Sequence, residues 1–126
     1  MYQLMVEDEF DAAHFLANYQ GRCETLHGHT WRVQAVFQAR AVEPNSGLAV
    51  DFQELKTVLK NILDRLDHSF LNENKLLKGL NPSCENLARL VYELVKKEFP
   101  LKIPGVSLSQ VTVWESARAG VTYSET

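Results

Sequence analysis

Residues 29–40, HTWRVQAVFQAR, alternate apolar and polar side chains, and this alternation constrains the fold more than any other feature of the chain. Successive side chains of a β-strand point to opposite faces, so a period of two gathers one kind of side chain on each face. The apolar face consists of Trp31, Val33, Ala35 and Phe37. The other face is largely polar, with Thr30, Arg32, Gln34 and Gln38. The pattern predicts a half-buried strand, which must pack its apolar face against a second layer.

Two segments with apolar residues at helical spacing are expected to supply that layer. Residues 52–66 form one apolar stripe, and Asp51 precedes it as an N-cap with Glu54 as a capping-box partner. A second helix is expected to start at Asn81-Pro82-Ser83, because proline suits the first helical turn, and Pro100 is expected to end it. Both helices are amphipathic, as helices that cover a sheet must be.

Three further segments are predicted as strands. Residues 2–10 alternate roughly, residues 109–116 alternate well, and residues 120–124 follow as an antiparallel partner across a short turn. The order is strand, strand, helix, helix, strand, strand. This order predicts an α+β fold with an antiparallel sheet covered on one face by two helices, and residues 1–126 are expected to form a single domain.

Composition excludes several classes of protein. The formal net charge is −3, and no run of basic residues is present, so a nucleic-acid partner is not expected. The apolar runs are far shorter than the roughly 20 residues of a membrane span, and the start of the chain lacks the pattern of a signal peptide. The expected location is therefore the cytoplasm. A chain of 126 residues can build its core without a metal, so any metal site is expected to serve chemistry.

The heptapeptide CETLHGH at 23–29 carries the most chemical information. His27 and His29 are two residues apart on a predicted strand, so both rings point to the same side and could hold one ion. Zn²⁺ favours imidazole, and a catalytic zinc site typically has three protein ligands and one open position. His14, at the end of the first strand, is the candidate third ligand. An accidental pair of histidines is the alternative.

Four other residues could take part in chemistry. Cys23 could close the metal site as a fourth ligand, or stand off the metal as a base or nucleophile, and its spacing leaves both open. Asp67 and His68 are adjacent, and an aspartate that favours a protonated histidine makes a proton shuttle. Glu115 follows a tryptophan at the end of a strand and could accept hydrogen bonds from a heterocycle. Taken alone, Asp67-His68 and Glu115 are more often ordinary surface groups.

Six motifs occur together in one order along nearly the whole chain. They are FDAAH at 10–14, CETLHGH at 23–29, GLAVDF at 47–52, LDHSFLN at 66–72, NPSCENLA at 81–88 and VWES at 113–116. Together they resemble the 6-pyruvoyl-tetrahydropterin synthase family, which includes the 6-carboxytetrahydropterin synthases of queuosine biosynthesis. The resemblance implies the tunnelling fold, a four-stranded antiparallel sheet with two helices on one face. It also implies a hexamer of two trimers, with active sites between subunits.

The resemblance assigns roles to individual residues. His14, His27 and His29 would be the zinc ligands. Cys23 would be the proton acceptor beside the metal, and Asp67 and His68 would complete the proton relay. Glu115 would anchor the pterin ring, helped by the hydroxyl of Ser83, where the family more often has threonine.

The same resemblance leaves the reaction open between related chemistries. The spacing CxxxHGH resembles the queuosine enzymes, and the spacing ExxHGH resembles a subgroup that cleaves dihydroneopterin; Cys23 and Glu24 satisfy both. The first expectation is conversion of 7,8-dihydroneopterin triphosphate to 6-carboxy-5,6,7,8-tetrahydropterin, with release of acetaldehyde and triphosphate. The alternative is cleavage of 7,8-dihydroneopterin, or of its triphosphate, to 6-hydroxymethyl-7,8-dihydropterin, with Glu24 as a catalytic residue. A 6-pyruvoyl-tetrahydropterin synthase and a non-enzymatic zinc or pterin module, in which Cys23 would ligate the metal, are the remaining possibilities.

Overall fold

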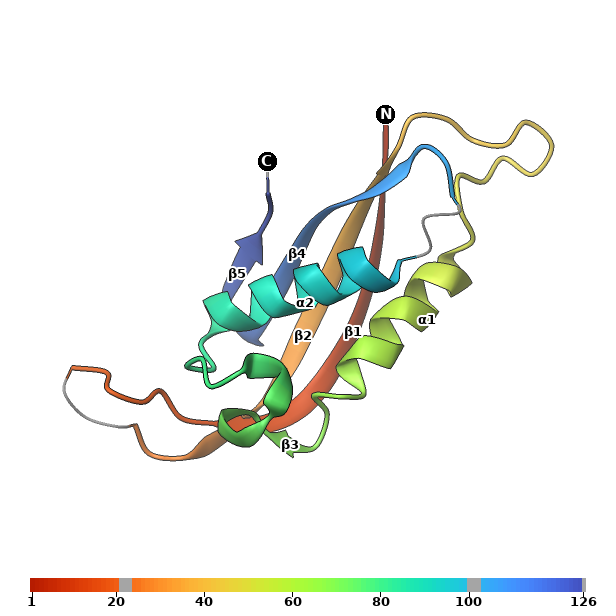
Figure 1. Cartoon of the computed structure of the whole chain (residues 1–126). Helices are drawn as coiled ribbons and strands as arrows, with labels where there is room; N and C mark the ends of the chain where they lie inside the picture. Colours follow the sequence, from red (N-terminus) through yellow and green to blue (C-terminus); the bar gives the residue numbers. More distant parts are fainter. Residues whose placement is uncertain (21–23, 100–102, 126) are drawn as a thin grey trace.

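The computed structural model describes residues 1–20, 24–99 and 103–125, and these form two layers, a sheet and a pair of helices (Figure 1). The strands are β1 (Tyr2–His14), β2 (His27–Ala39), β3 (Ser69–Phe70), β4 (Val106–Ser116) and β5 (Ala119–Tyr123). The helices are α1 (Phe52–Leu63) and α2 (Cys84–Glu98), and two short 3₁₀ turns, Leu71–Glu73 and Lys75–Leu77, lie between them in the chain. The α+β prediction is confirmed.

The sheet has the strand order β3-β1-β2-β4-β5. The four long strands pair antiparallel, as predicted, whereas the two-residue strand β3 pairs parallel to β1 at Ala12 and Ala13. The expected sheet of four strands is thus a sheet of five. Strand β3 was missed because a two-residue strand contains too little sequence to show a period.

Strands β1 and β2 are longer than expected at the ends that matter for chemistry. Strand β1 was predicted over 2–10 and continues to His14, which pairs directly with His27, the first residue of β2. Ala12 pairs with His29 in the same ladder. This register places three histidines at one end of two adjacent strands.

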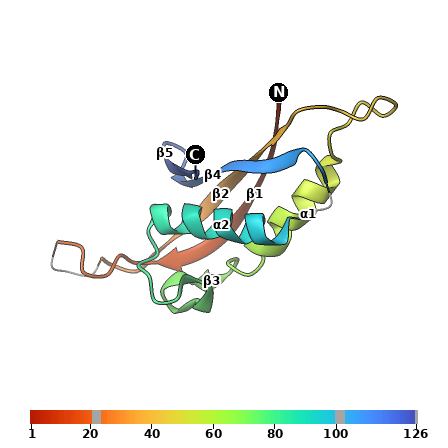
Figure 2. The same ribbon diagram turned by 45° about the horizontal axis from the view of Figure 1, so that its top comes forward.

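Both helices lie on the same face of the sheet, and the turned view in Figure 2 shows the same layering. The Asp51 carboxylate caps α1 by accepting a hydrogen bond from the Gln53 N–H, one residue earlier than in the expected capping box. Helix α1 ends at Leu63 rather than at 66. Helix α2 begins at Cys84, with the Ser83 hydroxyl as its N-cap, so Pro82 lies before the helix rather than in its first turn.

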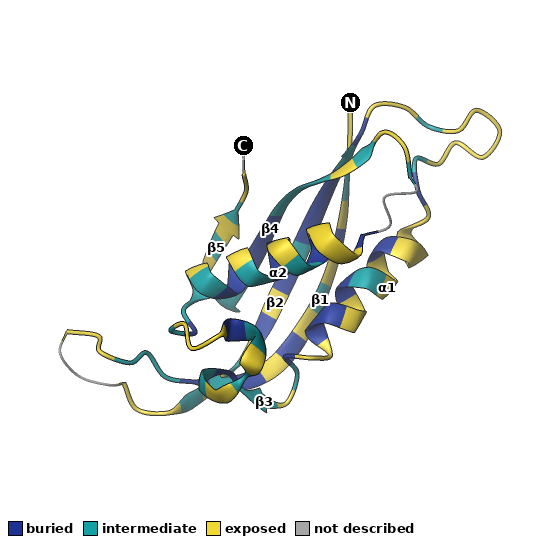
Figure 3. Ribbon diagram, viewed as in Figure 1, coloured by how far each residue is buried: buried dark blue, intermediate teal, exposed yellow. Residues whose placement is uncertain are grey.

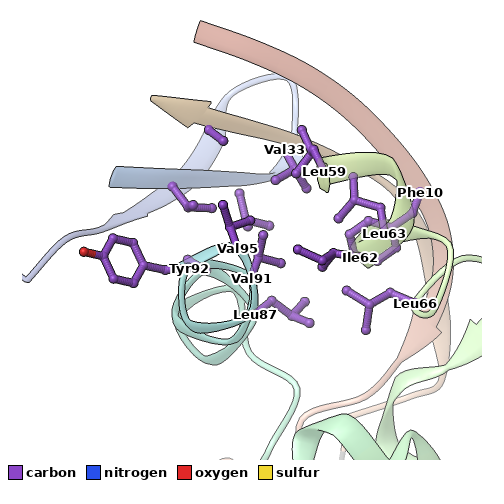
Figure 4. Close-up of a cluster of buried hydrophobic side chains, with 14 of the residues drawn as sticks. Phe10, Val33, Leu59, Ile62, Leu63, Leu66, Leu87, Val91, Tyr92 and Val95 are labelled. Carbon is purple, nitrogen blue, oxygen red and sulfur yellow. The ribbon is translucent and has the colours of Figure 1, made fainter. Parts of the chain in front are cut away.

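The core lies between the helices and the sheet, and Figure 4 shows side chains of both helices meeting those of the strands. From α1 the buried residues are Leu55, Leu59, Ile62 and Leu63, and from α2 they are Leu87, Ala88, Val91, Tyr92 and Val95. Full burial of one such aliphatic side chain contributes about 1.5–3 kcal/mol. Figure 3 shows buried positions alternating with exposed ones along β1 and β2, as the sequence pattern predicted.

Within the described ranges, neither helix combines the length and the apolar character that crossing a membrane requires.

Candidate metal and substrate site

Three histidine rings converge at the end of β1 and β2, on the face that the helices cover. His14 is 1% exposed, and the distance between its Nε2 atom and the Nε2 atom of His27 is 3.1 Å. His29 shares this face because it is two residues along the strand from His27. The structure therefore brings together the three histidines that the sequence proposed as metal ligands.

Hydrogen bonds to the backbone fix the orientation of two of these rings. The Nδ1–H of His14 donates to the Pro82 carbonyl at 2.7 Å, and the Nδ1–H of His27 donates to the Thr25 carbonyl at 2.8 Å. A neutral histidine that donates from Nδ1 presents a lone pair at Nε2. Two lone pairs facing each other at 3.1 Å repel, and a cation between them removes that repulsion. Contacts of this kind orient metal-binding histidines generally.

Glu115 of β4 contributes a carboxylate to the same cluster. Its Oε1 atom lies 3.3 Å from the Nε2 atom of His14 and 3.3 Å from the Nε2 atom of His29. Within the described part of the chain, the buried His29 Nε2 atom has no hydrogen-bond partner. Ligands about 2.0–2.1 Å from a tetrahedral zinc ion lie about 3.3 Å from one another. The four side chains could therefore hold a metal ion, and their spacing and nitrogen-rich donor set fit zinc.

The electrostatics of His29 are also those of a ligand. Burial lowers the pKa of His29, while the nearby Glu115 carboxylate raises it by a smaller amount. Burial prevails because it penalises the charged imidazolium. His29 therefore stays neutral at neutral pH, with a lone pair available for a metal.

Trp31 packs directly against the histidine cluster. It is fully buried, and its ring meets those of His14 and His29 edge to face, with centroids 4.9 Å and 5.2 Å apart. Its Nε1–H donates to the Ala12 carbonyl at 3.3 Å, and its other neighbour is Phe10, stacked at 6.0 Å. The apolar packing of the core thus sets the position of two candidate ligands.

A second polar cluster lies at the outer edge of β1. The Asp67 carboxylate accepts a hydrogen bond from the Asp11 N–H at 2.9 Å and contacts His68 Nδ1 at 2.9 Å. The Asp11 N–H, and to a smaller extent His68, hold the pKa of Asp67 below its usual range. His68 is exposed and has a φ of 55°, which is uncommon outside glycine and often marks a functional residue. Asp67 and His68 therefore pair as predicted, but in a group separate from the three histidines.

A shallow cavity of about 520 Å³ lies against the ends of β1 and β2. Its lining residues include His29 of β2, and His68 just before β3. Thr30 also lines it, and its hydroxyl donates to the Asp11 carboxylate.

The remaining candidate residues have varied surroundings. Cys23 lies outside the described residues. The Glu24 carboxylate accepts a hydrogen bond from the Leu16 N–H at 2.9 Å. The Ser83 hydroxyl accepts one from the Asn86 N–H at 3.1 Å, so part of its hydrogen-bonding capacity is used in capping α2. The roles of Glu24, Ser83 and Glu115 toward a substrate stay predictions.

Sequence reasoning missed the polar groups that surround the ligands. Asn72 and Asn81 bind the backbone of the segment that follows His14, and the Pro82 carbonyl orients the His14 ring. Both asparagines lie inside the motifs LDHSFLN and NPSCENLA, which was the available signal. Their partners are backbone groups distant in sequence, so no residue pattern reveals the contacts.

The fold and site define an α+β protein with a cluster of histidines able to hold a metal ion. The chain belongs to the 6-pyruvoyl tetrahydropterin synthase family, whose model matches residues 3–126. Members of this family are enzymes that act on pterins.

Two similar proteins carry different names. A 6-carboxy-5,6,7,8-tetrahydropterin synthase from Haemophilus influenzae is 30% identical, over 99% of this chain and 100% of its own. A dihydroneopterin monophosphate aldolase from Pyrococcus furiosus is 33% identical, over 94% of each chain. The structure of Caenorhabditis elegans 6-pyruvoyl tetrahydropterin synthase has the same fold, with a TM-score of 0.82, 23% identity and coverage of 99% of this chain and 96% of that one.

Proposed function

We propose that this protein is a zinc-dependent 6-carboxy-5,6,7,8-tetrahydropterin synthase that acts on 7,8-dihydroneopterin triphosphate, in the synthesis of a queuosine precursor. The observation that carries the proposal is the convergence of the Nε2 atoms of His14, His27 and His29 in a member of this family. The similarity to the Haemophilus influenzae synthase, which extends over both whole chains, supports the choice of reaction. The protein would act in the cytoplasm.

The three histidines would hold the zinc ion and leave the fourth position of a tetrahedral site open. When bound, the ion would supply Lewis-acid polarisation of oxygen atoms on the pterin side chain. The backbone carbonyls of Pro82 and Thr25 keep the Nδ1 protons on their histidines, so that each Nε2 atom faces the ion. The Glu115 carboxylate lies at the edge of the cluster and is 36% exposed, so it is also accessible to the ring of a bound pterin.

Cys23, Asp67 and His68 would move the protons. An ionised Asp67 favours a proton on the His68 imidazole, and its lowered pKa keeps it ionised at neutral pH. His68 could then donate that proton while the Cys23 thiolate accepts one from the substrate. The Ser83 hydroxyl would help to bind the pterin ring.

Assembly into a hexamer of two trimers would bring the two clusters of different chains together. The two edges of the sheet, formed by most of β1 and by β5, are free to pair with strands of neighbouring subunits. The pairing of β5 of one subunit with β1 of the next would close the sheets into a barrel. The Asp67-His68 pair lies at the β1 edge, so a subunit contact there would place it in a shared site.

The direct test is acetaldehyde release from 7,8-dihydroneopterin triphosphate by the zinc-loaded protein. We expect Cys23→Ala to lower turnover by about 100-fold or more, the usual contribution of a positioned base. Cys84→Ala is the matched control, because the Cys84 thiol donates to the Val113 carbonyl inside the fold. Undiminished turnover in Cys23→Ala contradicts the proton relay, and absence of acetaldehyde from the parent protein contradicts the proposed reaction.

A second candidate reaction is the aldol-type cleavage of 7,8-dihydroneopterin, or its triphosphate, to 6-hydroxymethyl-7,8-dihydropterin. The 33% identity to the Pyrococcus furiosus aldolase favours it, and Glu24 would be the catalytic residue. Assay of both substrates with the parent protein and with Glu24→Ala separates the two reactions. Release of the hydroxymethyl product by the parent protein, in place of acetaldehyde, would favour the aldolase. Formation of a 6-pyruvoyl product would favour a 6-pyruvoyl-tetrahydropterin synthase.

A further inference from the structure

Every backbone hydrogen-bonding group of three consecutive residues, Phe15 to Ala17, has a partner. The Asn72 amide binds both the N–H and the carbonyl of Phe15, at 3.0 Å and 2.9 Å. The Asn81 amide binds both groups of Ala17, at 2.8 Å and 2.9 Å. This segment directly follows His14, the last residue of β1.

Glu24 forms hydrogen bonds with Leu16, the middle residue of this segment. Its carboxylate accepts from the Leu16 N–H at 2.9 Å, and its own N–H donates to the Leu16 carbonyl at 3.0 Å. The pattern is that of a central strand, in which successive residues pair to alternate sides. On the side of Phe15 and Ala17, two amide side chains take the place of one neighbouring strand.

Two of these residues each precede a residue that orients a candidate metal ligand. Asn81 precedes Pro82, whose carbonyl accepts from His14 Nδ1. Glu24 precedes Thr25, whose carbonyl accepts from His27 Nδ1. The groups that hold Leu16 and Ala17 therefore also fix the two carbonyls that turn the histidine Nε2 atoms toward each other.

Asn81 is itself held by helix α2. The Asn86 amide donates to the Asn81 carbonyl at 2.8 Å, and the Asn86 N–H donates to the Ser83 cap. Asn72 lies two residues beyond β3, and its contact with Phe15 continues the pairing of β3 with β1. The segment after His14 is thus attached to helix α2 through Asn81 and to the strand beside Asp67 and His68 through Asn72.

We infer that Glu24, Asn72 and Asn81 are positioning residues of the metal site, and that Glu24 acts on it through its hydrogen bond to Leu16. The inference rests on the proposed zinc site, but it does not depend on which pterin reaction the protein performs. It gives Glu24 a role that either reaction requires. Groups that orient metal ligands typically change metal affinity by about 10–100-fold when they are removed.

Zinc affinity of the substrate-free protein tests the inference, measured by competition with a chromophoric chelator. We expect Glu24→Ala and Asn81→Ala each to weaken zinc binding by about 10-fold or more. Asn72→Ala should have a smaller effect, because neither neighbour of Asn72 orients a histidine. Glu24→Gln should bind zinc nearly as tightly as the parent, because the glutamine oxygen still accepts from the Leu16 N–H.

Controls separate positioning from loss of fold. Glu54→Ala and Asn45→Ala remove exposed side chains of the same types outside the site and should leave zinc affinity unchanged. Urea unfolding of each zinc-free variant reports stability, and the d–d absorption of bound Co²⁺ reports ligand geometry. If Asn81→Ala does not fold, Asn81→Asp keeps the acceptor for the Ala17 N–H, loses the donor to the Ala17 carbonyl and adds a negative charge.

The outcomes are distinct from those of the activity assay. Alanine variants that bind zinc as tightly as the parent overturn the inference. Glu24→Gln that is as impaired as Glu24→Ala overturns it for Glu24, because the charge would then be the required property. A parent protein that binds zinc but does not release acetaldehyde contradicts only the proposed reaction, whereas a parent that binds no zinc contradicts both.

Discussion

Trp31 joins the hydrophobic core to the candidate metal site, so Trp31→Phe should weaken both. The substitution removes the hydrogen bond from the indole N–H to the Ala12 carbonyl, which contributes about 0.5–1.5 kcal/mol. It also removes about three buried heavy atoms, at roughly 0.5–1.5 kcal/mol for each buried carbon lost from a fully packed position. Since partial collapse of the cavity reduces that sum, we expect the free energy of unfolding to fall by about 2–4 kcal/mol.

The matched control is the other tryptophan of the chain. Trp114 is only half-buried, and its main polar contact is with Arg32, whose guanidinium carbon lies 4.7 Å from the ring centroid. Phenylalanine retains a π-face, so Trp114→Phe should cost at most about 0.5–1 kcal/mol. The difference between the two variants isolates the effect of burial and of the lost hydrogen bond.

Urea unfolding followed by far-UV circular dichroism is the appropriate assay, because both substitutions change the fluorescence. The slope of the free energy against urea should stay the same in both variants, so that the midpoint alone reports stability. Zinc affinity should also fall in Trp31→Phe, since the ring supports His14 and His29. Equal midpoints for the two variants would refute the reasoning, and so would an unchanged zinc affinity in a destabilised Trp31→Phe.

Three further predictions follow from individual contacts. A Cβ atom on Gly120 would lie 2.7 Å from two atoms of the Trp114 ring, so Gly120→Ala should lower the free energy of unfolding in urea by about 1–3 kcal/mol. Gly28→Ala should lower it little, because a Cβ there would meet nothing nearer than 3.8 Å. Burial raises the pKa of Cys84 to about 11, so iodoacetamide at about pH 8 should label it slowly in the folded protein and rapidly after unfolding, as peptide mass spectrometry can measure. Because the pKa of Asp67 is lowered in the folded protein, its ionised carboxylate stabilises the fold at pH values above its unfolded pKa near 3.8. The difference in melting temperature between the parent and Asp67→Ala should therefore shrink as the pH falls below that value. A constant difference contradicts the assignment.

The packing treats two glycines differently. Gly28 lies between two candidate ligands on β2. The nearest described atom to a Cβ at this position is the Ala12 carbonyl oxygen at 3.8 Å, which is an ordinary contact. Gly120, near the start of β5, is a glycine that the packing requires, because a Cβ there would meet the Trp114 ring.

Periodicity and motifs were sufficient for the architecture and for the identity of the candidate ligands. The alternation in residues 29–40 and the two helical stripes predicted the layers. The hydrophobic effect depends only on whether the side chain at each position is apolar or polar. The helix limits were less accurate, because capping depends on local hydrogen bonds that several residues could make. The sequence contains a good capping residue at the N-terminus of each helix, Asp51 and Ser83. Which residue is the first helical one depends on the hydrogen bond that the cap makes.

The sequence by itself determined that two histidines of HGH share a face, that Asp67 and His68 are neighbours, and that the chain has the motifs of a pterin-synthase family. Only the tertiary structure decided that His14 pairs with His27 across two strands, that Glu115 reaches the same cluster from β4, and that Glu24 binds Leu16. The physical reason is range. Spacing along one strand is fixed by local backbone geometry, whereas register between strands and the partners of backbone groups depend on how distant segments pack.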